Sequence, residues 1–148
     1  MSKKDALDLC VTPRVRAACL CLHVQRAARA LARRFDAAFR PLGLTNGQFS
    51  LMMALHRIGA PRMGEVSEIL AMDRTTLTAA LKPLERRGLV RVEVDEADRR
   101  SRRLTLTAAG TELLAQAYPI WESEHAKVEA LITGSDPDTL RADLRRLS

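Results

Sequence analysis

The chain has 148 residues, of which 47% are hydrophobic and 28% are charged, and this composition is typical of a folded, soluble protein. No uncharged run approaches the roughly 18 residues of a transmembrane helix, and the first residues carry no export signal, so we expect a cytoplasmic protein with no membrane partner. The net charge is +6, and 20 of the 24 basic residues are arginine, which binds phosphate groups in a forked geometry. A nucleic acid is therefore the first partner to consider.

The first helical pattern is long. It begins at Thr12, an N-cap residue followed by Pro13, and it ends at Pro41 and Gly43. A helix of about 28 residues, at 1.5 Å per residue, is longer than a small domain is wide. Part of its apolar face therefore needs a second subunit, and residues 12–42 are predicted to be a dimerisation helix.

The next segment predicts two shorter helices. Thr45 and Gln48 form the capping box T-x-x-Q, which opens a helix that ends at Gly59. Residues 64–71 form a short helix whose inward side chains are predicted to be Val66, Ile69 and Leu70.

A third short helix follows across a tight turn. Asp73 is its N-cap, and the helix covers residues 74–87 before Gly88 ends it. Pro83 cannot donate a hydrogen bond inside this helix, so a kink or a local break is expected near it.

The last part of the chain combines a hairpin with two helices. Residues 89–94 and 102–107 alternate apolar and polar side chains around the segment DEADRRS, which predicts a β-hairpin with an exposed, charged connection. Thr107 then caps a long helix that Pro119 is expected to bend. A short terminal helix restarts at Pro137, so residues 108–148 complete a predicted second dimerisation region.

The order helix, tight turn, helix and hairpin predicts a winged helix-turn-helix. The fold class is mainly α with a small β-hairpin wing, and residues 45–107 form the DNA-binding lobe. The second helix of the pair enters the major groove and contacts bases or phosphates through polar residues at its start. These candidate contacts are Arg74, Thr75, Thr76, Thr78 and Lys82.

The charged connection of the hairpin predicts a minor-groove contact. Arginine on a narrow loop reaches the minor groove, where the potential is most negative, and Arg99 and Arg100 are the candidates. Asp98 is expected to pair with an adjacent guanidinium group and to orient it.

The sequence from Met72 to Gly110 resembles the DNA-binding half of the MarR (multiple antibiotic resistance regulator) family. The matching residues are the Asp-x-Arg motif of Asp98 and Arg100, followed by Leu-Thr-Ala-Ala-Gly at residues 106–110. The resemblance extends over essentially the whole chain. It implies one MarR-type domain over residues 1–148, a homodimer that binds a pseudo-palindromic DNA operator, and repression that a small molecule or thiol oxidation relieves.

The resemblance also implies an effector pocket between the dimerisation and DNA-binding parts. Seven side chains are its expected lining: Cys19, His23, Arg26, Phe49, Met52, His56 and Trp121. An arginine beside apolar walls suits an aromatic acid, because a buried carboxylate needs a paired cation. The alternative interpretation is that the histidines are ordinary surface or core residues.

The cysteines leave two interpretations open. Cys19, Cys21 and His23 form a C-x-C-x-H pattern, but an unbroken helix points Cys21 about 200° away from Cys19, which predicts no metal site and no unstrained disulfide. In the first interpretation, Cys10, Cys19 and Cys21 are free thiols that serve as small apolar packing residues. The alternative is redox sensing by Cys19 or Cys21, because family members that sense organic hydroperoxides carry a reactive cysteine near this place, although their tyrosine partners are missing here.

Enzymes and DNA-packaging proteins are the two alternative classes of protein. The chain has no P-loop, no dinucleotide-binding glycine motif, no zinc-protease motif and no nucleophile elbow, so no enzyme activity and no cofactor are predicted. A DNA-packaging protein has the same positive charge but lacks sequence preference, and the ratio of specific to random DNA affinity separates the two.

Overall fold

The computed structural model describes residues 11–148, and the chain divides into two units at the Arg34–Phe35 junction. The units are described separately below. Cys10 lies outside the described residues. Among the described residues, no helix is long and apolar enough to cross a membrane.

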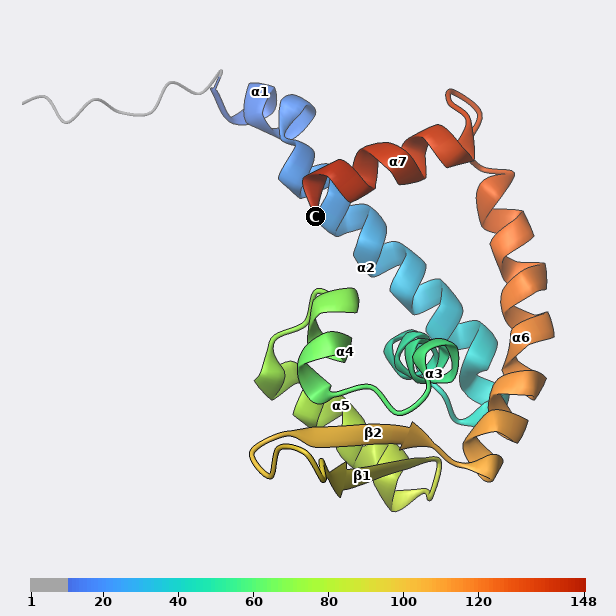
Figure 1. Ribbon diagram of the computed structural model, residues 1–148. Helices are drawn as coiled ribbons and strands as arrows, with labels where there is room; N and C mark the ends of the chain where they lie inside the picture. The colour runs from blue at the N-terminus through green and yellow to red at the C-terminus, as the bar shows by residue number, and fades with distance from the viewer. Residues whose placement is uncertain (1–10) are drawn as a thin grey trace, which may run out of the picture. The chain divides into compact units, whose positions relative to one another are not determined.

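The first unit contains a broken helix, where the sequence predicts a continuous one. α1 covers Val11–Ala18, and α2 begins at Leu20, with Cys19 between them (Figure 1). α2 ends at Phe39, so its last residues, 35–39, belong to the second unit. Side chains replace part of the helical hydrogen bonding at the break. The Leu22 N–H lies 3.5 Å from the Cys19 sulfur, and the His23 ring lies 3.0 Å from the Ala17 carbonyl oxygen. Helical periodicity could not reveal this local competition for backbone groups.

The helix-turn-helix of the second unit begins after a 3-10 turn, η1, at Arg40–Leu42. α3 covers Asn46–Ile58, and the predicted capping box of Thr45 and Gln48 is present. α4 covers Met63–Ile69 and α5 covers Arg74–Arg86, with Asp73 as the N-cap of α5. These boundaries confirm the predicted order of helices.

In this region, the side chain of Ile69 and the helix around Pro83 differ from what the sequence predicts. Ile69 is 45% exposed and does not point inward, because the seven-residue α4 turns only Val66 fully into the core. Pro83 lies inside α5, which continues to Arg86 without a break.

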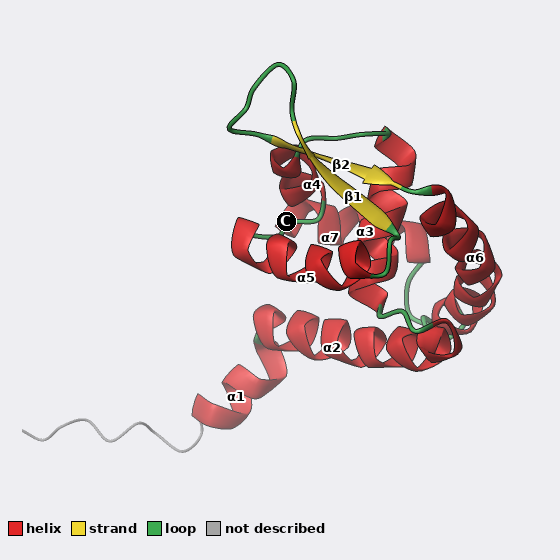
Figure 2. Cartoon of the chain, turned by 90° about the horizontal axis from the view of Figure 1, so that it is seen from below, coloured by secondary structure: helices red, strands yellow, loops and turns green. Residues whose placement is uncertain are grey.

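The hairpin and the last two helices follow the predicted order. β1, Val90–Val94, pairs antiparallel with β2, Arg102–Leu106, and the connection between the strands projects beyond the helices (Figure 2). α6 covers Ala108–Glu129 and α7 covers Pro137–Leu147. Within the second unit, α6 leads away from the hairpin and α7 turns back at its far end (Figure 1).

One core joins the helix-turn-helix, the hairpin and α6. Its fully buried side chains come from the end of α2 and from α3, α4, α5, β2 and α6, and they include Leu51, Met52, Leu77 and Leu104. Because α3 and α5 each bury one face in this core, the opposite face of α5 is left exposed.

The Leu-Thr-Ala-Ala-Gly segment connects the hairpin to α6. The Thr107 hydroxyl donates to the Gly88 carbonyl oxygen at 2.7 Å and accepts the Gly110 N–H at 3.0 Å. A Cβ on Gly110 would clash with the Leu89 carbonyl oxygen and would lie 2.8 Å from the Leu106 side chain. Only glycine therefore allows this close approach of helix and strand.

Candidate nucleic-acid interface

The exposed face of α5 presents polar and basic side chains along one line. Leu77, Leu81 and Leu84 are buried on the other side of the helix. The exposed residues line a shallow hollow of about 330 Å³, and they are Arg74, Thr75, Thr78, Ala79 and Lys82. Their spacing repeats every three to four residues, so a single groove can meet all of them.

Two of the predicted threonine contacts hold the start of α5. The Thr76 N–H and hydroxyl donate to the two oxygens of Asp73 at 2.8 and 2.9 Å, which lowers the pKa of that carboxyl. The Thr78 hydroxyl donates to the Arg74 carbonyl oxygen at 2.7 Å. Thr76 therefore binds the capping carboxylate of Asp73 and lies outside the line of exposed residues, whereas Thr78 belongs to it.

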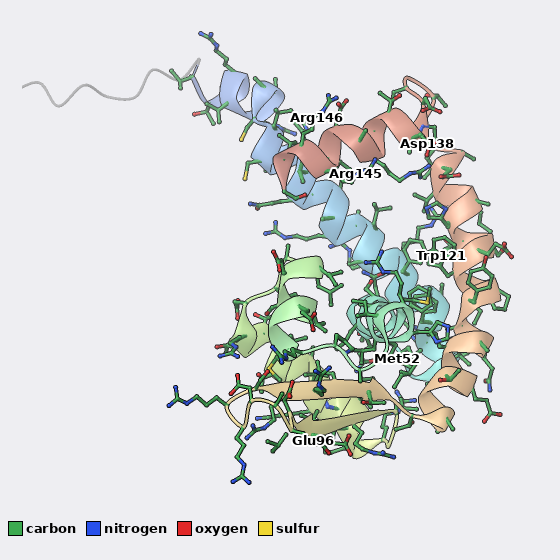
Figure 3. All side chains as sticks on the ribbon, in the orientation of Figure 1. Met52, Glu96, Trp121, Asp138, Arg145 and Arg146 are labelled. Atoms are coloured by element: carbon green, nitrogen blue, oxygen red, sulfur yellow. The ribbon has the colours of Figure 1, made fainter. Side chains whose placement is uncertain are left out.

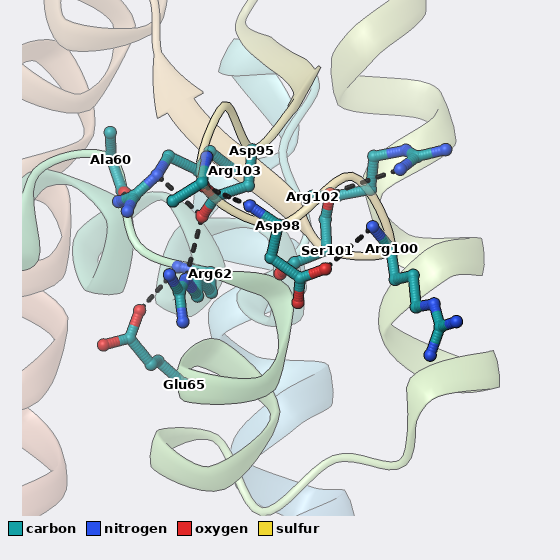
Figure 4. Close-up of polar contacts among 10 residues, drawn as sticks. Ala60, Arg62, Glu65, Asp95, Asp98, Arg100, Ser101, Arg102 and Arg103 are labelled. Atoms are coloured by element: carbon teal, nitrogen blue, oxygen red, sulfur yellow. Dashed lines mark hydrogen bonds and ion pairs between the residues drawn. The ribbon is translucent and has the colours of Figure 1, made fainter.

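The hairpin tip, which we define as residues 96–101, carries two of the four neighbouring arginines. Arg99 and Arg100 (the latter labelled in Figure 4) are exposed, and no hydrogen bond or ion pair of their guanidinium groups occurs among residues 11–148. The guanidinium group of Arg102 instead donates to the carbonyl oxygens of Arg99 and Ser101, at 3.2 Å each. The charge run is thus divided into Arg99 and Arg100, whose guanidinium groups have no partner among the described residues, and Arg102 and Arg103, whose guanidinium groups bind the protein itself.

Asp98 does not pair with a neighbouring guanidinium group as expected. Its carboxylate accepts the backbone N–H of Arg100 at 3.0 Å, and its carbonyl oxygen accepts the Ser101 N–H at 2.9 Å. Asp98 therefore fixes the backbone that carries Arg100, because an aspartate side chain readily binds an N–H two residues further along a turn.

Asp95, which no sequence pattern singled out, holds the base of the tip. It is 1% exposed, it accepts the Arg62 Nε–H at 2.8 Å, and its Oδ2 forms an ion pair with Arg103 Nε at 3.0 Å (Figure 4). The Ala97 N–H, followed by the two arginines, holds the pKa of Asp95 below its ordinary value against the opposing effect of burial. Its only signal in the sequence was the end of the apolar alternation of the strand, which cannot identify partners 33 residues away.

A cavity of about 710 Å³ lies within the second unit, between α3, α4 and α6. Aromatic side chains form one wall, with Phe49 and Tyr118 at ring distances of 6.5 and 5.9 Å from Trp121. The only basic side chains in the lining are His56 and Arg57. Phe49, His56 and Trp121 therefore meet as the sequence analysis expected.

The remaining predicted pocket residues do not take part in this lining. Met52 is fully buried in the core, because its position on α3 faces inward, and Met53 lines the cavity instead (Figure 3). Cys19, His23 and Arg26 lie in the first unit, so their role in a pocket stays a prediction.

The two described cysteines lie on either side of the start of α2. Cys19 is half-buried and Cys21 is exposed, and both are free thiols. The Gln25 amide donates to the Cys21 sulfur at 3.1 Å. Among residues 11–148, no group of three or more His, Cys, Asp or Glu residues is arranged to hold a metal ion.

Comparison with known proteins identifies the family. The sequence model of the MarR family matches residues 42–101. The chain is also 30% identical over 124 residues to the uncharacterized HTH-type transcriptional regulator YybA of Bacillus subtilis, which covers 81% of this chain and 80% of that protein. The chain belongs to the MarR family.

Solved MarR-type structures extend this similarity. The transcriptional regulator MosR of M. tuberculosis, in complex with DNA, is 40% identical with a TM-score of 0.79, over 87% of this chain and 92% of that chain. The transcriptional repressor CouR, bound to a 23-mer DNA duplex, is 28% identical with a TM-score of 0.79, over 90% of this chain and 94% of that chain. The predicted winged helix-turn-helix is confirmed, and this MarR-family chain is a DNA-binding transcriptional regulator.

Proposed function

We propose that the protein is a homodimeric repressor that binds a pseudo-palindromic operator through α5 and the hairpin tip. The observation that carries the proposal is the pairing of an exposed polar line on α5 with a tip whose Arg99 and Arg100 are exposed and whose guanidinium groups have no partner among residues 11–148. Arg74, Thr75 and Thr78 contact base edges in the major groove, and Lys82 contacts phosphate. The two tip arginines enter the adjacent minor groove, whose negative potential attracts guanidinium groups.

Exposed leucines near the C-terminus support the homodimer. Leu131 and Leu147 are 67% and 65% exposed, and Leu140 and Leu144 on α7 are also exposed. Large apolar side chains gathered on terminal helices favour burial against a second copy, and a two-fold dimer places the two α5 helices about one turn of DNA apart. Replacing Leu140 and Leu144 by glutamate is expected to shift the protein to monomers in sedimentation velocity.

An operator titration tests the proposed function. The protein is titrated at fixed salt with the intergenic DNA upstream of its own gene and with a scrambled duplex of equal length. A sequence-specific regulator binds the first about a thousandfold more tightly than the second. Equal affinities would instead indicate a DNA-packaging protein. Repression itself is checked by placing that intergenic DNA before a reporter gene, and activation of the reporter would overturn the repressor assignment.

We further propose that the effector is an aromatic carboxylic acid held in the 710 Å³ cavity. This volume is within the range of small-molecule sites. The aromatic wall of Phe49, Tyr118 and Trp121 stacks on the ring of the ligand, and Arg57 pairs with its carboxylate.

The position of the cavity supports a route from effector to DNA. His56 and Arg57 lie in the last turn of α3, which continues directly into the connection to α4. In that connection, the carbonyl oxygens of Ala60 and Pro61 accept hydrogen bonds from Arg103 and Leu104 of β2, at 2.8 and 2.9 Å. A ligand that displaces the end of α3 therefore also displaces the base of the hairpin.

Tryptophan fluorescence tests the effector, because Trp121 is the single tryptophan of the chain. Benzoate and salicylate are titrated against benzyl alcohol, a neutral compound of similar size. Saturable quenching by the acids alone, together with release of operator DNA, is expected. Arg57→Gln should weaken the acid response and leave the operator affinity of the free protein unchanged. Quenching without DNA release would contradict the effector role.

Redox sensing by Cys19 and Cys21 is a second candidate, and the broken helix favours it. The geometric argument against a disulfide between them assumed an intact helix, whereas the helix is interrupted at Cys19. Cys21 is also exposed, and the Gln25 amide donates a hydrogen bond to its sulfur. In the reaction, two thiols and one hydroperoxide give a disulfide, an alcohol and water.

The same operator titration separates the two signals. Release of DNA by peroxide that is reversed by reductant, and lost in Cys19→Ser or Cys21→Ser, would establish redox control. Release by an aromatic acid that persists in both serine variants would establish ligand control and leave the thiols as packing residues.

A further inference from the structure

Asp95 is the one buried charged side chain among residues 11–148, and its two carboxylate oxygens face different parts of the molecule. Oδ1 accepts the backbone N–H groups of Ala97 and Asp98, at 2.8 and 3.3 Å, at the start of the hairpin tip. Oδ2 accepts the Arg62 Nε–H and forms an ion pair with the Arg103 guanidinium group. We call Asp95, Arg62 and Arg103 the Asp95 clasp.

The clasp ties the tip to the helix-turn-helix. Arg62 is the N-cap of α4, and its own N–H donates to Glu65 at 2.6 Å, so the guanidinium group extends from a fixed helix start. Arg103 belongs to β2, and it also donates to the Ala60 carbonyl oxygen. The Asp95 N–H closes the tip by donating to the Ser101 carbonyl oxygen at 3.1 Å.

Such a cluster contributes little to folding stability, because the free energy lost by burying a carboxylate offsets much of the free energy that its ion pairs supply. Its effect on the geometry of the hairpin tip explains it better. The six-residue tip has no apolar side chain in the core of the second unit, so its backbone is held by the clasp, by the turn of Asp98 and by the hydrogen bonds of Arg102. A contact that is positioned before binding does not lose the free energy of ordering when DNA arrives.

We propose that Asp95 is the positioning residue for minor-groove recognition, which holds the hairpin tip so that Arg99 and Arg100 are directed at the groove while α5 lies in the neighbouring major groove. The inference rests on the proposed function, since it needs the tip to meet the minor groove. Asp95 itself is buried and touches no DNA.

The sign of the expected effect separates positioning from simple electrostatics. Asp95→Asn removes a negative charge near DNA, which by itself strengthens binding to phosphate. Positioning predicts the opposite, a loss of operator affinity of about tenfold, which is the size expected when one base contact is lost. Glu96→Gln is the matched control, because it removes the same charge from an exposed neighbouring side chain that takes no part in the clasp. Its affinity is expected to equal or slightly exceed that of the unchanged protein.

Footprinting on the full-length protein supplies a readout that a merely structural role would not change. With Asp95→Asn, protection from hydroxyl radicals at the minor-groove positions is expected to disappear, while protection of major-groove guanines from dimethyl sulfate remains. In the Arg99→Ala, Arg100→Ala background, the additional change Asp95→Asn should alter affinity less than about twofold, because coupled residues are not additive. If Asp95→Asn does not fold, Arg62→Gln replaces it, since Arg62 is 44% exposed and its loss leaves the buried strand intact.

The possible outcomes are distinct. If Arg99→Ala, Arg100→Ala keeps full affinity and minor-groove protection, the proposed placement of the tip is wrong. If that double variant loses protection but Asp95→Asn keeps it, only the role of Asp95 is wrong. Equal loss of protection in both grooves with Asp95→Asn would indicate general destabilisation and would also overturn the positioning role.

Discussion

The two parts of the interface, α5 and the hairpin tip, are held in different ways. α5 is fixed by neighbours in sequence, with Asp73 capping its first turn and Leu77, Leu81 and Leu84 burying one face. The tip is fixed from a distance, through ion pairs and hydrogen bonds that join Asp95 to Arg62 and Arg103 to Ala60. The position of α5 is therefore set by its own cap and packing, whereas the position of the tip depends on the residues at its base.

The largest effect is expected from a substitution that disturbs the packing on which both α5 and the hairpin tip depend. Gly110→Ala places a Cβ against the Leu89 carbonyl oxygen and the Leu106 side chain, at the junction of hairpin and α6. Overpacking of this kind is expected to lower the free energy of unfolding by about 3 kcal/mol, measured by urea denaturation. Gly64→Ala is the control, because a Cβ there meets no atom within 4 Å. Equal stability of the two variants would contradict the close approach at Gly110.

The next prediction compares Arg100, whose guanidinium group has no partner among the described residues, with Arg103, which binds Asp95 and Ala60. Arg100→Ala is expected to lower operator affinity by about tenfold with no change in Tm, because its guanidinium group has no partner among the described residues. Arg103→Ala is expected to lower Tm and to cost less affinity, because Arg62 still holds Asp95. Salt-matched titrations and thermal unfolding check both variants. Equal losses of affinity would contradict the division of the charge run.

A smaller effect is expected on α5, and it concerns base preference. Arg74→Ala is expected to reduce discrimination at one operator base pair by about 1 kcal/mol, the lower end of the range for a bidentate contact. Affinities for a set of single-base operator variants measure this. A loss that is uniform across all sequences would assign Arg74 to phosphate binding instead.

The contrast between the two regions also explains what the sequence could reveal. The capping box at Thr45, the N-cap at Asp73 and the alternation of the strands are local patterns, and the helices and the hairpin they predict are confirmed. The partners of Asp95 lie 33 residues before it and 8 after it, so no local pattern records them.

The same limit applies to errors of detail. Met52 and Met53 are adjacent on α3, and apolar periodicity does not determine which of them faces the core and which the cavity. Likewise, the break at Cys19 depends on the His23 ring and the Cys19 sulfur occupying backbone groups, which a count of apolar positions ignores.

The last prediction is that the geometry of α5 and of the hairpin tip does not change between pH 8 and pH 5. Hydrogen bonds and ion pairs hold the pKa values of both Asp73 and Asp95 below the ordinary value of about 3.9. A lowered pKa in the folded state contributes stability that is fully present above the unfolded pKa and is lost only as the pH falls through the lowered value. Both regions should therefore keep their geometry down to about pH 4.

Backbone amide chemical shifts measure this directly, at the Thr76 N–H for α5 and at the Ala97 N–H for the tip. Both are expected to stay constant from pH 8 to 5 and to move together with acid titration below that range. A midpoint near neutral pH at Ala97, absent in Asp95→Asn, would contradict the lowered pKa of the buried carboxyl. If both amides are constant while DNA affinity still changes between pH 7 and 5, the titrating group lies outside the interface.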